Sequence, residues 1–143
     1  MITVVSWLAE DVRPALESLR SADKTDEIRQ IDQQIEQVQE FWRSWGVAGG
    51  GSQVSREGAG GVVEISADRV GDVQGLRERT SRALQSRVSV GVGMKPSESS
   101  TALRVALSRG GDRVVLYENG IESEIVQKAE RPLAPTKPQS PVA

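Results

Sequence analysis

Residues 88–117 read VSVGVGMKPSESSTALRVALSRGGDRVVLY and hold the most specific pattern in this chain of 143 residues. Valines alternate with serine and glycine at its start, which predicts a strand over 87–94 with one bulky face and one bare face. Pro96 opens a predicted helix over 99–109, because proline is favoured in a first helical turn. Two glycines end that helix, and a last strand is predicted over 114–117.

Working outward, the N-terminal part of the chain adds further elements of the same kinds. Apolar residues from Ile28 to Trp45 recur three and four positions apart, which predicts a helix with one buried stripe that ends at Gly46. The predicted elements are a strand over 2–8, helices within 14–45 that the polar segment 21–26 divides, strands over 53–56 and 62–66, a helix over 68–86, and the three elements described above. The order β-α-β-β-α-β-α-β predicts an α+β, ferredoxin-like fold, with an antiparallel sheet and its helices on one face.

The composition excludes several kinds of chemistry. The chain has no cysteine and no histidine, so thiolate nucleophiles, imidazole bases and the usual zinc ligands are absent. The apolar run at the N-terminus is short, lacks a preceding basic region and meets Glu10 at once, so it is typical of a strand and not of a signal peptide. We therefore expect a cytoplasmic protein with no membrane contact.

Three segments together resemble a known family. They are Ser89-Val90-Gly91-Val92-Gly93 with the helix and Asp112-Arg113-Val114 that follow it, Leu8-Ala9-Glu10-Asp11-Val12 after the first strand, and the glycine hairpin Gly58-Ala59-Gly60-Gly61. The pattern resembles the palm shared by GGDEF-type diguanylate cyclases and the minimal CRISPR polymerases, over about residues 1–119. The resemblance implies a palm domain over 1–120 that joins nucleoside triphosphates into cyclic oligonucleotide signals in antiviral defence.

The resemblance also implies a degenerate active site. Two-metal phosphoryl transfer needs carboxylates that converge on Mg²⁺, and the family takes them from the end of the first strand and from the hairpin. Leu8 stands at the first of these positions and Glu10 at the second, while Gly60 and Gly61 stand at both hairpin positions. Leu107 stands where the family has a lysine for the phosphates. Glu10 and Asp11 remain as weak candidate metal ligands, and Mg²⁺ is expected only if the protein is active.

We therefore favour an inactive palm that works by binding a nucleotide, a cyclic oligonucleotide or a protein partner, as a homodimer. Its candidate nucleotide-binding residues are Gly58, Ala59, Gly60, Gly61, Gly91 and Gly93. Each glycine also has a plain alternative, a tight turn in the hairpin or close packing of a helix on the strand. A second hypothesis is an active cyclase with a rearranged acid set of Glu10, Asp11 and Glu57.

A third hypothesis is an adaptor that works through its C-terminal tail. From residue 121 the chain is predicted to leave the domain, with a short helix over 121–130 and prolines at every third position from Pro132 to Pro141. Such spacing is typical of a disordered tail or of an extended ligand for an aromatic groove.

Arginines gather in the second half of the domain, where a solvated helix face or pairing with a complementary partner explains them. Nucleic acid is not expected, because exposed aromatic residues to accompany these arginines are lacking. Trp42 and Trp45 continue the apolar stripe and are predicted to be core residues. The role of Trp7, at the end of the first strand, is left open.

Overall fold

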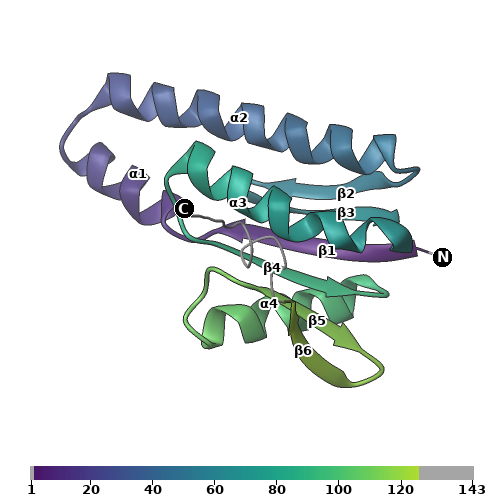
Figure 1. Ribbon diagram of the computed structural model, residues 1–143. Coiled ribbons are helices and arrows are strands. Elements are labelled where there is room, and N and C mark those ends of the chain that lie inside the picture. Colours follow the sequence, from purple (N-terminus) through teal and green to yellow (C-terminus); the bar gives the residue numbers. More distant parts are fainter. Residues whose placement is uncertain (1, 126–143) are drawn as a thin grey trace, which may run out of the picture.

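The computed structural model describes residues 2–125, which form one six-stranded sheet with helices on both faces (Figure 1). The strands lie in the order β2-β3-β1-β4-β5-β6. All neighbouring pairs are antiparallel except β4 and β5, which are parallel where a wholly antiparallel sheet was predicted. The α+β class is confirmed. The strands are β1 (Ile2–Ala9), β2 (Ser52–Glu57), β3 (Gly60–Ser66), β4 (Val88–Gly93), β5 (Val114–Glu118) and β6 (Ile121–Ile125).

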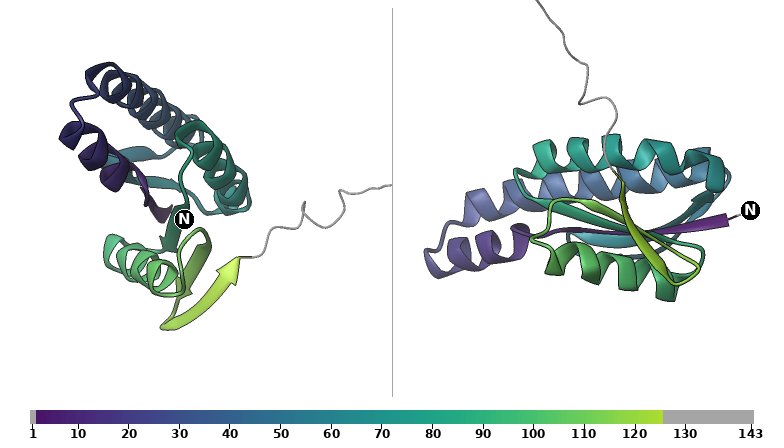
Figure 2. Two further views of the ribbon diagram at one scale, coloured as in Figure 1. Left: turned by 90° about the vertical axis from the view of Figure 1, so that its left-hand side faces the viewer. Right: turned by 60° about the horizontal axis from the view of Figure 1, so that its bottom comes forward.

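Helices α1, α2 and α3 cover one face of this sheet, and α4 covers the other (Figure 2). The prediction that all helices share one face is therefore wrong for α4. The reason lies in β4, which is buried on both faces: its valines join the core beneath α2 and α3, and its glycines lie against α4. A strand buried on both faces needs cover on both sides. The helices are α1 (Val12–Ser21), α2 (Thr25–Ala48), the 3-10 helix η1 (Ala67–Asp72), α3 (Val73–Leu84) and α4 (Pro96–Ser108).

The break between α1 and α2 falls in the polar segment 21–26, as predicted. Helix α2 does not end at Gly46, as we expected, but continues to Ala48. Gly46 is buried where α2 crosses β3, and a Cβ atom at this position would overlap the side chain of Val63. The close packing of α2 on the sheet therefore outweighs the low helix propensity of glycine.

The main core lies between the sheet and α1 to α3, with Trp42 fully buried at its centre. The Trp42 ring stacks on Trp7 with ring centroids 5.0 Å apart, and it meets Trp45 edge-on at 5.9 Å. Its Nε1 donates a hydrogen bond of 2.9 Å to the Thr80 hydroxyl. The predicted core role is confirmed for Trp42, Trp45 is partly buried and packs against the core, and Trp7 is a core residue as well.

Strand β6 corrects the predicted end of the domain, because residues 121–125 pair with β5 and do not form a helix. Asn119 and Gly120 form the connecting turn, and both have positive φ values, 53° and 77°. A two-residue hairpin turn with positive φ at both positions favours the dipeptide Asn-Gly, so the sequence contained a signal for this hairpin. The rest of the predicted tail, with its proline repeat, lies outside the described residues.

Candidate functional site

The predicted vestigial residues meet at one end of the sheet, where β1 ends beside the β2–β3 hairpin. Leu8 pairs with Gly60 of β3 on one side and with β4 on the other. Helix α4 ends nearby, because the loop that follows it reaches Glu10. The site residues that the structure brings to this end are Leu8, Glu10, Asp11, Gly58, Ala59, Gly60, Gly61 and Leu107.

The carbonyl groups of the hairpin backbone are hydrogen-bonded to neighbouring segments. Gly58 has a φ of 53°, which the tight turn requires and glycine adopts without strain. The buried Gln39 of α2 donates from Nε2 to the carbonyls of Gly58 and Gly60, each at 2.7 Å. The Ala59 carbonyl accepts from the backbone N–H of Ala9 at 2.9 Å. A phosphate cradle needs free N–H groups that converge on the anion, whereas the bonds that hold this turn use its carbonyls.

Gln39 was missed in the sequence, although a signal was available. It lies four positions after Ile35 and next to Val38, so the helical period places it on the apolar face of α2. A glutamine on such a face needs hydrogen-bond partners. The hairpin carbonyls supply them for Nε2, whereas the buried Oε1 has no partner among the described residues.

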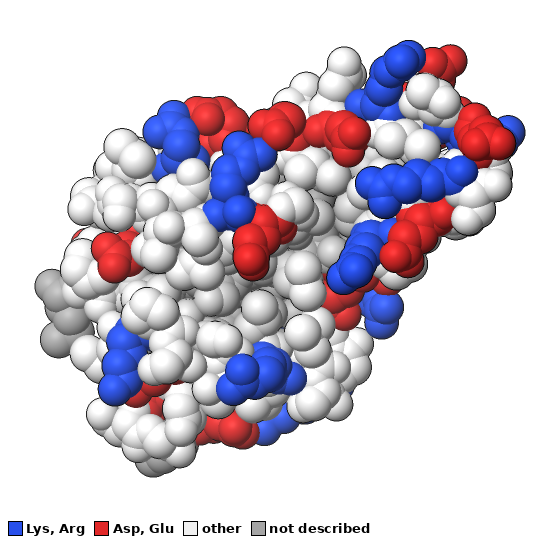
Figure 3. Space-filling model, turned by 180° about the vertical axis from the view of Figure 1, so that it is seen from behind, with Lys and Arg blue, Asp and Glu red and all other residues white. Residues whose placement is uncertain are grey.

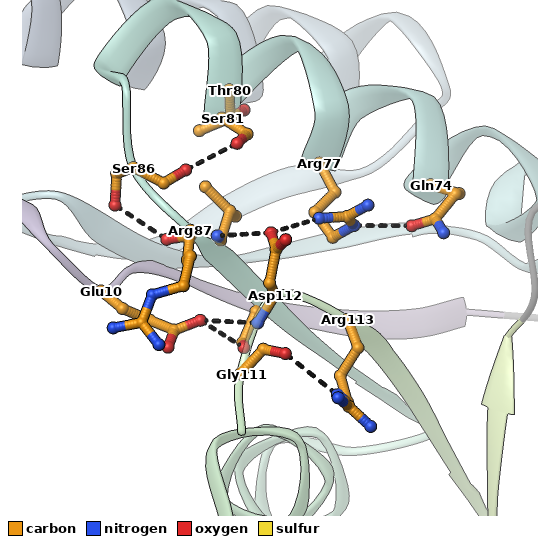
Figure 4. Close-up of polar contacts among 12 residues, drawn as sticks. Glu10, Gln74, Arg77, Thr80, Ser81, Ser86, Arg87, Gly111, Asp112 and Arg113 are labelled. Atoms are coloured by element: carbon orange, nitrogen blue, oxygen red, sulfur yellow. Dashed lines mark hydrogen bonds and ion pairs between the residues drawn. The ribbon is translucent and has the colours of Figure 1, made fainter. Parts of the chain in front are cut away.

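Glu10 is used as a structural acceptor. Its Oε2 accepts from the Ser89 hydroxyl at 2.6 Å and from the backbone N–H of Asp112 at 2.9 Å (Figure 4). The carboxylate lies directly on Gly111, where a Cβ atom would overlap it. These bonds join the end of β1 to β4 and to the α4–β5 loop, so Glu10 holds three segments together at this end.

Asp11 is held by Arg87. The backbone N–H of Arg87 donates to Asp11 Oδ2 at 2.8 Å, and the guanidinium reaches both carboxylate oxygens at 2.8 and 3.2 Å. Hydrogen bonds from the side chain and the backbone of Arg87 lower the pKa of the Asp11 carboxyl below its ordinary value. The pair is partly exposed, so its contribution to stability is that of a surface ion pair, at most about 1 kcal/mol.

We expect the Arg87→Gln variant to be less stable than the wild type at neutral pH and to approach it in acid. A carboxyl with a lowered folded-state pKa adds stability above its unfolded pKa, and this is lost as the pH falls through the folded pKa. Urea unfolding at about pH 7 and about pH 3 measures the difference. Arg20→Gln is the control, because Arg20 is exposed and forms no ion pair within residues 2–125. A pH-independent difference would contradict the assignment.

Arg77 and Asp112 complete the network shown in Figure 4. The nearly buried Arg77 donates from Nη1 to Asp112 Oδ1 at 2.6 Å and from Nε to Gln74 Oε1 at 2.7 Å. Asp112 has a φ of 56°, in the left-handed region that aspartate tolerates better than most residues. This pair was not predicted from the sequence, where the only local signal is an aspartate directly after two glycines.

The acid set of an active cyclase is not assembled. Among residues 2–125, no group of three or more acidic side chains is placed to hold a metal ion. Glu57 lies on the exposed edge strand β2 and pairs with Gly60, while Glu10 and Asp11 are held by the partners described above. The rearranged set of Glu10, Asp11 and Glu57 is therefore not supported.

Gly91 and Gly93 face α4 and leave no room for a nucleotide base. A Cβ atom on Gly91 would collide with the backbone of Ser99 and Leu103, and one on Gly93 would lie 2.7 Å from the Ser99 nitrogen. The alternative of close helix–sheet packing is the correct one for both glycines.

An apolar strip runs beside the end of the sheet where the vestigial residues meet. It lies between α4 and the part of the same sheet face that no helix covers. The Ser6 and Ser99 hydroxyls lie 2.7 Å apart, which places Ser6 on the α4 face of β1. Leu8 shares that face two residues on, because side chains alternate along a strand. Across the middle of this side of the molecule, Figure 3 shows an uncharged and hollowed surface with charged residues around it. The strip comprises the half-buried residues Leu8, Val62, Leu103 and Leu107.

The arginines of the second half are mostly paired within the chain. Five of them form ion pairs with acidic side chains, so they do not make a free basic face. These pairs are Arg69–Asp72, Arg77–Asp112, Arg87–Asp11, Arg109–Glu122 and Arg113–Glu124.

One comparison with known proteins gives a match. The X-ray structure of a diguanylate cyclase/phosphodiesterase from Caldicellulosiruptor saccharolyticus has a similar fold, with a TM-score of 0.53 and 12% sequence identity. The alignment covers 85% of this chain and 79% of that chain. The chain therefore has a GGDEF-like palm fold. No protein-family model and no curated protein matches it, so the relation to CRISPR polymerases stays a prediction. In the part of the chain described, no helix is long and apolar enough to cross a membrane.

Proposed function

We propose that the protein is a palm-fold binding module that does not catalyse metal-dependent nucleotidyl transfer. The observation that carries the proposal is the arrangement of Glu10, which keeps a carboxylate at a position where the family resemblance implies a metal ligand. Its Oε2 accepts hydrogen bonds from the Ser89 hydroxyl and from the backbone N–H of Asp112. Such catalysis depends on the charge that metal ions supply. A palm without the ligand set keeps its binding surfaces and loses this chemistry.

The surface beside the emptied site favours a protein partner over a triphosphate. Leucine and valine side chains offer no hydrogen-bond donor to a phosphate. An apolar segment of another chain, a second copy included, is the better match for an uncharged hollow of this kind. The cytoplasmic location, the homodimer and a partner for the tail remain predictions within this proposal.

We expect no product from ATP or GTP with Mg²⁺, assayed by separation of cyclic and linear nucleotides. We expect the Glu10→Gln variant to show the same absence of product as the wild type. Its free energy of unfolding should be lower by about 1 kcal/mol, because the group that accepts from Ser89 and Asp112 is no longer charged. The matched control is Glu57→Gln, an exposed change on the hairpin strand that should leave the stability unchanged. Mg²⁺-dependent product that disappears in Glu10→Gln would overturn the proposal.

A further inference from the structure

A pocket of about 320 Å³ lies between α2 and α3. The two helices lie side by side on the same face of the sheet (Figure 2). Its lining includes Gln34, Val38 and Phe41 from α2, and Arg79, Thr80 and Ala83 from α3. The volume is at the lower end of the range of small-molecule sites. None of the vestigial site residues lines it.

Arg79 supplies the pocket with an unused cation. Its guanidinium lies over the Phe41 ring, 4.0 Å from the ring centroid. Nine arginines within residues 2–125 pair with an acidic side chain, and Arg79 is not one of them. The aromatic ring fixes the guanidinium plane while its N–H edge stays available. A fixed guanidinium without a carboxylate partner is suited to bind an anion from a ligand.

The floor of the pocket is apolar. Val38 is 5% exposed and forms the buried part of the lining, while the exposed Ala83 lines the pocket with its methyl group from α3. The Thr80 hydroxyl accepts from Trp42 Nε1 and donates to the Leu76 carbonyl at 2.8 Å, so it is occupied and offers a ligand mainly its methyl group. A flat, weakly polar ring matches such a floor better than a sugar or a free ion does.

The rim adds two neutral carboxamides. Gln34 and Gln37 lie one helical turn apart on α2 and both line the pocket. Neither forms a side-chain hydrogen bond within the described part of the chain. Each carboxamide offers donors and an acceptor together, the combination that reads the edge of a heterocyclic base. A ligand without polar ring atoms would leave both groups unused.

We propose that this pocket binds a small heterocyclic anion of the nucleoside monophosphate class. The ring lies on Val38 and Ala83, its polar edge meets Gln34 and Gln37, and the phosphate meets the N–H edge of Arg79. The volume admits one such unit and not a cyclic oligonucleotide. Neither Glu10 nor its hydrogen-bond partners Ser89 and Asp112 line the pocket, so the proposal is independent of whether the palm retains catalysis.

The test is a titration of the full chain with AMP and GMP, followed through the indole N–H resonance of Trp42. This group is hydrogen-bonded to Thr80 in the pocket wall and therefore reports on binding. Adenosine, inorganic phosphate and benzoate are the comparison probes. Arg79→Gln should weaken AMP or GMP binding at least about tenfold, since it removes a charge-assisted bond.

Two further variants make the test specific. Arg82→Gln removes the same charge one turn along α3 from a side chain outside the pocket lining, and it should leave the affinity within about twofold. Ala83→Leu enlarges an apolar side chain of the lining and keeps the Arg79 charge, and it should weaken binding by obstructing the pocket. The proposal is overturned by an absence of saturable binding at about 10 mM, by adenosine, phosphate or benzoate binding as tightly as the nucleotides, or by equal losses in Arg79→Gln and Arg82→Gln.

Discussion

The Trp42→Ala variant is expected to lose about 3–5 kcal/mol of the free energy of unfolding. Trp42 is fully buried, stacks on Trp7 and packs edge-on against Trp45. Truncation leaves a large cavity between the sheet and α2, and it removes the bond from Nε1 to Thr80. A domain of this size is stable by about 5–15 kcal/mol, so the loss is a large share of the total. Urea unfolding followed by circular dichroism measures it.

A second variant separates the volume of this side chain from its hydrogen bond. Trp42→Phe keeps an aromatic ring against Trp7 and gives up the indole N–H. The Thr80 hydroxyl still donates to the Leu76 carbonyl in that variant. We therefore expect Trp42→Phe to cost about half as much as Trp42→Ala or less. A loss below about 1 kcal/mol in Trp42→Ala would show that Trp42 is not the centre of the core.

The elements predicted best were those whose patterns are local. The stripe from Ile28 to Trp45 repeats every three to four residues, and it gives α2 its buried face. The alternating valines and glycines of β4 gave both the strand and its bare face. Such patterns are local because a helix and a strand each have a fixed period. The Asn119-Gly120 turn was equally local, so β6 was an error of interpretation and not a limit of the sequence.

The roles of the site residues depended on contacts that sequence spacing does not contain. Asp112 bonds to Glu10 from 102 positions away, and Ser89 bonds to it from 79 positions away. The sequence showed that Glu10 kept a carboxylate, but only the fold shows what that carboxylate does. The side of the sheet that α4 covers is a similar case, because the period of a helix does not say which face of a sheet receives it.

Two readings of Gly91 were open in the sequence, and a single methyl group distinguishes them. In the structure, a Cβ atom at this position would collide with the Ser99 carbonyl oxygen and the Leu103 nitrogen, and would lie 2.8 Å from the Ala102 carbonyl carbon. These are backbone atoms of α4, so a side-chain rotation does not relieve the overlap. We expect Gly91→Ala to lower the free energy of unfolding by about 1–3 kcal/mol because α4 must move away from β4.

Gly75→Ala is the matched control, since Gly75 lies in α3 with open space around its Cβ position. The same change should stabilise the protein there by about 0.5–1 kcal/mol, because alanine is the better helix former. Changes of opposite sign in the free energy of unfolding would confirm that the glycine face of β4 allows α4 to pack closely against the strand. A neutral Gly91→Ala variant would mean that α4 does not press on β4. That result would leave the glycine face open to a ligand and restore it as a nucleotide site.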